Sequence, residues 1–136
     1  PNTVTGLDHV VVRSPNLDRT TDALVSAGAD LRRVRQIAFG DDPMEQRFFR
    51  FGGPIVELVG PATPAPDAGD IPATIWGYAF TVADIDAAAA LLGDRCSGPR
   101  EAVQPGRRIA TVRTDDLGIA PTVAFMTPHR RRPGVR

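Results

Sequence analysis

The chain contains an internal repeat, and this repeat is the feature that most limits what the chain can fold into. Residues 6–18 read as an apolar strand followed by the start of a helix, and residues 74–86 read the same way. Residues 16–18 align with residues 84–86, which lie 68 positions later, and similar strands close both units at a spacing of 67. These near-equal spacings indicate that one structural unit has been duplicated.

Hydrophobic periodicity and turn residues predict the order βαβββ in each unit. In the first unit, Asn16 or Asp18 can cap a helix that ends at Gly28. The predicted strands of this unit are residues 7–13, 31–38, 45–51 and 54–60. The second unit repeats the order, with a helix over 85–92 and strands near 75–82, 100–104, 107–113 and 121–127.

A chain of 136 residues has the length of a single domain, which here consists of the two repeats. The first unit covers residues 6–61 and the second covers residues 74–128. Residues 62–73 are rich in proline, which predicts a semi-rigid exposed linker that adds nothing to the core. Residues 129–136 form a basic tail, and we assign no function to it.

Composition excludes several classes of function. The 16 basic residues are all arginine and balance 16 acidic residues, so lysine-based covalent catalysis is excluded and binding to nucleic acid is disfavoured. The single Cys96 cannot form an internal disulfide, and we expect it to be a passive thiol in a protein of the cytoplasm. No leader or long apolar run is present, so we expect no membrane partner.

The repeat and its strand motifs carry a resemblance. Gly6-Leu-Asp-His9 stands in the first strand and Val56-Glu-Leu-Val59 in the fourth, within two tandem βαβββ units. The chain therefore resembles the vicinal oxygen chelate superfamily, which includes glyoxalase I, bleomycin-resistance proteins and extradiol dioxygenases. The resemblance implies an α+β fold in which two tandem βαβββ units form a curved mixed β-sheet cleft with helices on the outer face. It also implies a homodimer.

In metal-using members of that superfamily, the ligands come from the first and fourth strands of each unit. The resemblance assigns these positions here to His9, Glu57, Gly77 and Ala124. His9 and Glu57 can ligate Zn, Ni, Mn or Fe(II), whereas Gly77 and Ala124 supply no donor atom. Two readings stay open for the remaining pair: an incomplete metal site, or a direct hydrogen-bonded pair that acts as a general base or binds a polar ligand group. The second reading is favoured, so no cofactor is expected.

Other candidate residues lie on the same strands. Alternation places His9 and Arg13 on one face of the first strand, and an arginine facing a cleft can hold a carboxylate or phosphate through paired hydrogen bonds. Trp76 and Tyr78 are expected to pack against the second helix. The predicted catalytic residues are His9 and Glu57. The predicted ligand-binding residues are His9, Arg13, Arg47, Phe49, Glu57 and Arg113.

Three functions are compatible with this sequence. The leading one is metal-independent binding of a small organic ligand in the cleft, as in antibiotic-sequestering relatives of the superfamily. The second is a metal-dependent lyase, isomerase or dioxygenase that takes a third ligand from a position such as Gln46. The third is a non-catalytic interaction module with a filled cleft. The sequence leaves open whether the protein is an enzyme.

Overall fold

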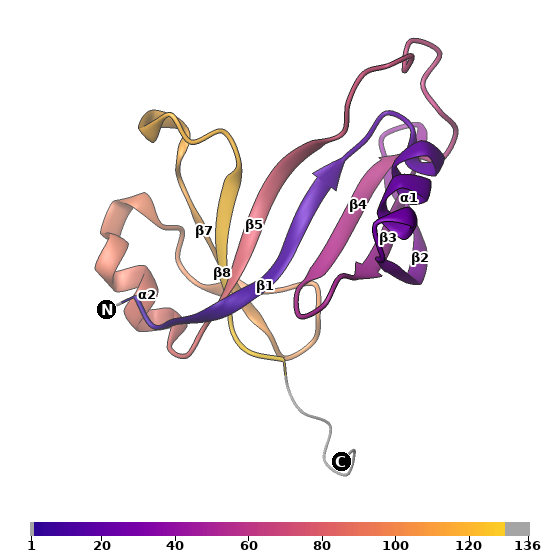
Figure 1. Ribbon diagram of the computed structural model, residues 1–136. Coiled ribbons are helices and arrows are strands. Elements are labelled where there is room, and N and C mark those ends of the chain that lie inside the picture. The colour runs from indigo at the N-terminus through magenta and orange to yellow at the C-terminus, as the bar shows by residue number, and fades with distance from the viewer. Residues whose placement is uncertain (1, 130–136) are drawn as a thin grey trace. The chain divides into compact units, whose positions relative to one another are not determined.

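The computed structural model describes residues 2–129, and its elements follow the predicted order (Figure 1). Eight strands form a mixed sheet with the order β2-β3-β4-β1-β5-β8-β7-β6, and two α-helices accompany it. The α+β class and the eight-stranded mixed sheet predicted from the sequence are confirmed. The strands are β1 (Val4–Arg13), β2 (Asp30–Phe39), β3 (Asp42–Arg50), β4 (Ile55–Pro61), β5 (Thr74–Val82), β6 (Arg100–Glu101), β7 (Arg108–Val112) and β8 (Thr122–Met126).

The compact units of the structure do not follow the boundaries of the sequence repeat. The middle unit comprises His9–Gly77, and the end unit comprises the residues up to Asp8 together with those from Tyr78 onward. The first half of β1 therefore belongs to the end unit, where Thr5 Oγ1 donates a hydrogen bond of 3.3 Å to the carbonyl oxygen of Thr81 on β5. The second half of β1 belongs to the middle unit, where it pairs with β4 in parallel.

Both helices begin at the residues that the sequence repeat aligns. Helix α1 (Leu17–Ser26) is capped by Asn16, whose side chain accepts a hydrogen bond from the amide of Arg19. Asn16, not Asp18, is therefore the cap. Helix α2 (Ile85–Leu92) is capped in the same way by Asp84. No helix among residues 2–129 is long and apolar enough to cross a membrane.

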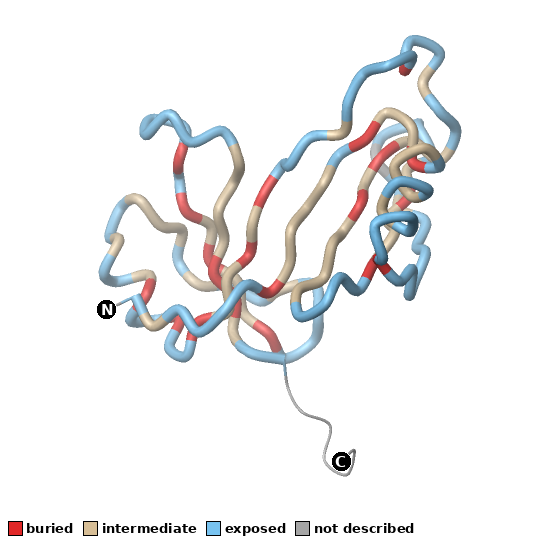
Figure 2. The backbone as a smooth tube through the Cα atoms, in the orientation of Figure 1, coloured by how far each residue is buried: buried red, intermediate tan, exposed pale blue. Residues whose placement is uncertain are grey.

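Each unit has its own hydrophobic core beneath its helix. In the middle unit, Leu17 of α1 packs with the buried Phe49 of β3 and Leu58 of β4. In the end unit, Ile85 and Ala88 of α2 pack with buried residues of β5, β7 and β8. Figure 2 shows these buried positions in red along the strands, with exposed positions on the helices in pale blue. Strand alternation thus gives the strands of each unit one face that is buried under the helix of that unit.

The segment between the repeats differs from the exposed linker predicted for residues 62–73. Ala68 is buried, and the guanidinium group of Arg19 on α1 donates hydrogen bonds to the carbonyl oxygens of Gly69 and Ile71. The amide of Ala65 donates to the carbonyl oxygen of Pro15. Most of the segment is exposed, but its buried Ala68 and its hydrogen bonds to Arg19 attach it to the middle unit, because proline-rich chain still offers carbonyl acceptors that an arginine can bind.

Three further details differ from prediction. β3 begins at Asp42 rather than 45, because Gly40 takes a positive φ of 65° and tightens the turn before it. β6 contains only Arg100–Glu101. Trp76, expected to pack in the core, is 48% exposed. Of the predicted basic tail, His129 is described and residues 130–136 lie outside the described residues.

Candidate functional site

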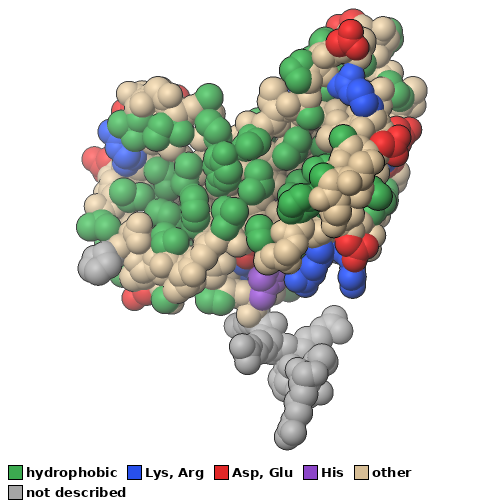
Figure 3. All heavy atoms as spheres, viewed as in Figure 1, with side chains coloured by type: hydrophobic (Ala, Val, Ile, Leu, Met, Phe, Trp, Pro, Cys, Tyr) green, Lys and Arg blue, Asp and Glu red, His purple; other side chains and the backbone are tan. Residues whose placement is uncertain are grey.

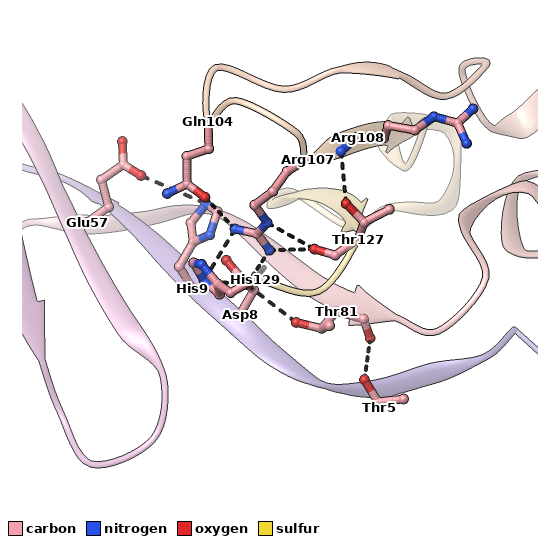
Figure 4. A network of polar contacts seen from close by, with 10 residues as sticks. All are labelled: Thr5, Asp8, His9, Glu57, Thr81, Gln104, Arg107, Arg108, Thr127 and His129. Atoms are coloured by element: carbon pink, nitrogen blue, oxygen red, sulfur yellow. Dashed lines mark hydrogen bonds and ion pairs between the residues drawn. The ribbon is translucent and has the colours of Figure 1, made fainter. Parts of the chain in front are cut away.

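His9 and Glu57 lie next to each other on neighbouring strands of the middle unit. In the parallel pairing of β1 with β4, His9 stands opposite Ile55 and Val11 stands opposite Glu57, so the two polar side chains are diagonal neighbours. His9 Nε2 is 3.8 Å from Glu57 Oε2, and their side chains are 20% and 17% exposed. Figure 4 marks this contact with a dashed line. The two side chains that the sequence predicts to pair are therefore neighbours, but 3.8 Å is too long for the predicted hydrogen bond between these two atoms.

The hydrogen bond to Glu57 comes instead from Gln46 on β3. Gln46 Nε2 donates to Glu57 Oε1 at 2.6 Å, whereas the buried Gln46 Oε1 has no hydrogen-bond partner. Burial raises the pKa of the Glu57 carboxyl above its ordinary value, although the His9 charge, the Gln46 hydrogen bond and the charge of Arg35 oppose the rise. A carboxyl with a raised pKa can exchange a proton closer to neutral pH.

These three residues occupy the face of the middle unit's sheet that lies opposite α1, which we call the helix-free face. The assignment follows from alternation, because Leu58 and Phe49 point into the core under α1 and their neighbours Glu57 and Phe48 point the other way. Residues paired across strands point to the same side of a sheet. The register then gives the helix-free face as His9, Val11, Arg13, Arg33, Arg35, Gln46, Phe48, Arg50, Ile55, Glu57 and Val59.

Two of the predicted ligand-binding residues lie on the other face. Phe49 is fully buried in the core of the middle unit. The Arg47 side chain reaches α1, where it pairs with Asp18 at 2.8 Å and donates to Thr21 at 2.9 Å. Its Nε also pairs with Glu45 at 2.7 Å, which holds the pKa of that carboxyl below its usual value. Neither side chain therefore lies on the helix-free face.

The other two predicted arginines fall in different units. Arg13 is exposed on the helix-free face, in register with Val59. Arg113 follows β7 in the end unit, where it lines a hollow of about 510 Å³ together with Thr114, Ile119 and neighbouring residues of the β7–β8 connection. The structure therefore does not place Arg113 in the same unit as His9 and Glu57.

The end unit contains a buried charge network that sequence reasoning missed. Arg107 Nη2 lies 2.6 Å from Asp8 Oδ1, and both side chains are only 3% exposed. Figure 4 shows that Arg107 also bonds the carbonyl oxygen of Thr127, the side chain of Gln104 and the ring of His129. His129 Nε2 in turn lies 3.2 Å from Asp8 Oδ1. The network joins the middle of β1 to the residues that follow β8.

The sequence contained only a weak signal for this network. Asp8 precedes His9 in the motif that carried the resemblance, and Arg107 opens the strand predicted over 107–113. Nothing local distinguishes Arg107 from its neighbour Arg108, whose exposed side chain pairs with Asp86. A contact across 99 positions of sequence is visible only in the fold.

Known structures with the same fold have several different activities. A methylmalonyl-CoA epimerase from Mycobacterium tuberculosis matches with a TM-score of 0.65 and 21% identity, over 94% of this chain and 91% of the epimerase. A Streptomyces coelicolor methylmalonyl-CoA epimerase in complex with 2-nitronate-propionyl-CoA matches with a TM-score of 0.64 and 20% identity, over 93% and 99%. This chain has the vicinal oxygen chelate fold. A 4-hydroxymandelate synthase from S. coelicolor matches with a TM-score of 0.66 and 20% identity, over 93% of this chain and 49% of the synthase.

These likenesses establish the fold of the chain and not its activity, because one fold carries many functions. No model of a protein family matches the chain, and no curated protein matches it. The activity of this chain therefore depends on its own side chains and not on its fold.

The metal chemistry of the superfamily can be tested against those side chains. Of the four positions that the resemblance assigns to metal ligands, only His9 and Glu57 carry donor atoms. Gln46 cannot complete the set in its present orientation, because its amide nitrogen faces Glu57. Among residues 2–129, no group of three or more His, Cys, Asp and Glu side chains could hold a metal ion. Catalytic zinc sites generally have three protein ligands, so the donor set does not fit a resident ion.

Proposed function

We propose that the protein binds a small organic ligand on the helix-free face of the middle unit, where His9, Glu57 and Gln46 bind a polar group of that ligand. The observation that carries the proposal is the position of Glu57, a partly buried carboxyl with a raised pKa, 3.8 Å from the His9 imidazole. Together the two groups can donate and accept hydrogen bonds, as a carbonyl or hydroxyl group requires. The proposed binding does not depend on a metal ion.

The surroundings of the pair support a ligand-binding role. Phe48, Val59 and Val11 lie on the same face and are half-buried, so an apolar surface surrounds the polar groups. Small-molecule sites typically combine such apolar lining with a few polar groups that fix orientation. One structural neighbour is described in complex with 2-nitronate-propionyl-CoA, which makes a carbonyl-containing acyl derivative a sensible first probe.

The test is a binding screen with matched variants. The full chain is titrated with 2-nitronate-propionyl-CoA and with small neutral and charged carbonyl compounds, and binding is followed by ligand-observed NMR. We expect at least one compound to bind, and we expect His9→Ala and Glu57→Ala to weaken it by about tenfold, the effect of losing one strong hydrogen bond. Glu101→Ala changes an exposed carboxylate on β6 and serves as the control. Binding that is unchanged in both site variants would refute the proposal.

Elemental analysis separates the proposal from the metal-dependent lyase, isomerase or dioxygenase. Protein purified without added metal is expected to contain far less than one divalent ion per chain. About one ion per chain, lost in His9→Ala, would instead support the metal-dependent function.

We further propose that the protein is a homodimer, as the resemblance implies, and that it lies in the cytoplasm, as its single cysteine indicates. Ile75 and Trp76 on β5 are each 48% exposed, and a second copy of the chain could cover such apolar groups. Figure 3 shows hydrophobic side chains in green across the face that it draws. Sedimentation equilibrium tests the dimer, since a monomer at micromolar concentration would contradict it.

A further inference from the structure

The helix-free face of the middle unit carries more positive charge than its own acidic residues balance. Cross-strand register places Arg35, Gln46, Val59 and Arg13 in one row across β2, β3, β4 and β1. The next row contains Arg33, Phe48, Glu57 and Val11. These two rows therefore place three of the four arginines of the helix-free face, Arg13, Arg33 and Arg35, around the site of the proposed ligand.

The direction of these arginines follows from their neighbours on β2. Gln36 points toward the helix side, because its amide donates to Glu45, and Glu45 in turn bonds Arg47, which reaches α1. Alternation then turns Arg35 and Arg33 to the opposite side. The electrostatic effect of Arg35 on Glu57 agrees with this placement.

These arginines have no acidic partner within ion-pair distance among residues 2–129. The acidic residue at the end of β2, Asp30, pairs with Arg32 at 3.0 Å. Arg13, Arg33 and Arg35 are exposed and enter none of the ion pairs of the described chain. By contrast Arg47, on the other face of the same sheet, is bound by two carboxylates.

The spacing of the arginines suits a small anion. Residues two positions apart on one strand lie about 7 Å apart, so Arg33 and Arg35 can both reach one carboxylate or phosphate group. Arg13 lies three strand spacings away, at about 14 Å between Cα atoms, on the far side of Gln46 and Val59. A ligand held between these arginines would lie over Phe48 and within reach of Glu57.

Protection of an edge strand explains only part of this pattern. β2 is the outer strand of the sheet, and charged side chains at such an edge discourage pairing with other chains. Arg13 lies on β1, which has neighbours on both sides, so edge protection does not account for it.

We propose that the ligand of the helix-free face is an organic anion, whose carboxylate or phosphate binds Arg33 and Arg35 while its apolar part lies over Phe48. This inference rests on the proposed function, since it names the class of ligand for the same site. Arg13 contributes positive charge from the opposite side of that site. Exposed guanidinium groups bind such anions through charge-assisted hydrogen bonds.

The experiment compares three probes of one shape and different charge. Benzoate, phenyl phosphate and the neutral benzamide are titrated into the full chain, and the amide shifts of the protein are followed by NMR. At least one anion is expected to bind about tenfold more tightly than benzamide and to lose that advantage as salt is raised. The two anions distinguish a carboxylate ligand from a phosphate ligand.

The matched variants are the double change Arg33→Gln and Arg35→Gln, and the control Arg100→Gln. Arg100 is an exposed arginine of β6 with no ion pair among the described residues. The double variant should weaken anion binding by about tenfold, while the control should bind like the wild type. Thermal melting of each variant checks that the fold is retained.

The outcomes distinguish this inference from the proposed function on which it rests. Benzamide binding as tightly as the anions, or no saturable binding of either anion, would overturn the inference. A double variant that aggregates but binds anions normally would also overturn the inference, because Arg33 and Arg35 would then only protect the edge strand. Binding of neutral compounds that still requires His9 and Glu57 would leave the proposed function standing.

Discussion

Removing the buried carboxylate of Asp8 should be among the most damaging single changes in the chain. Arg107 is 3% exposed, and in the variant Asp8→Ala its guanidinium group would lose its carboxylate partner and keep the carbonyl oxygen of Thr127, the side chain of Gln104 and the ring of His129. Leaving one charge of a buried pair uncompensated typically costs about 3–5 kcal/mol. That is a large part of the 5–15 kcal/mol by which a domain of this size is usually stable.

Three variants allow the cost to be assigned to the pair itself. Asp8→Asn keeps an acceptor near the guanidinium group and should cost about 1–3 kcal/mol, so it remains measurable if Asp8→Ala does not fold. The double variant Asp8→Ala with Arg107→Met removes both charges and should be more stable than the sum of the single changes predicts. Asp86→Ala breaks an exposed ion pair with Arg108 and should change stability little.

The assay is urea denaturation followed by far-ultraviolet circular dichroism, with the free energy of unfolding taken from linear extrapolation. The reasoning would be refuted if Asp8→Ala cost no more than Asp86→Ala. It would also fail if the single and double changes were additive, since additivity means that the two side chains do not interact.

Three other predictions concern the middle unit and the single thiol. Gly60→Ala should destabilise by about 1–3 kcal/mol in urea denaturation, because the new Cβ would lie 2.1 Å from the carbonyl oxygen of Ser14, whereas Gly53→Ala meets nothing within 4 Å and should not. The raised pKa of Glu57 means that its ionisation costs stability, so its contribution to the unfolding free energy should fall as pH rises through the range just above the ordinary glutamate value, and Glu57→Gln should remove that contribution. Burial raises the pKa of the Cys96 thiol, so iodoacetamide should modify it more slowly than free cysteine at pH 8, and an equal rate would contradict this.

The parts of the fold that were predictable from the sequence depend on local chemistry. Asn16 and Asp84 each accept a hydrogen bond from an amide three residues later, so the start of each helix depends on only four consecutive residues. Period-two alternation likewise marked the faces of β1 and β4, where polar and apolar residues take turns. These signals gave the order of elements in both repeats.

The side chains of β3 could not be assigned in the same way. The run from Arg47 to Phe51 mixes aromatic and basic residues, so alternation alone does not say which face is buried. The cross-strand partners decide it, because Phe49 stands opposite Val56 of β4, which packs against the core. Arg47 and Phe49, the residues of β3 that were predicted to bind ligand, therefore lie on the face that points toward the core under α1.

The same register explains why arginines on the two faces of the sheet differ in their ion-pair partners. The side chain of Arg47 points toward α1. A guanidinium group buried there without a partner would be costly, and Arg47 is instead bound by Glu45 and Asp18. Arg33 and Arg35 point to the helix-free face, and their exposed charges are stable in water without a partner. A charge that folding does not neutralise remains available for binding. The helix-free face therefore combines unneutralised cations with Glu57, a partly buried carboxyl whose pKa is raised by burial.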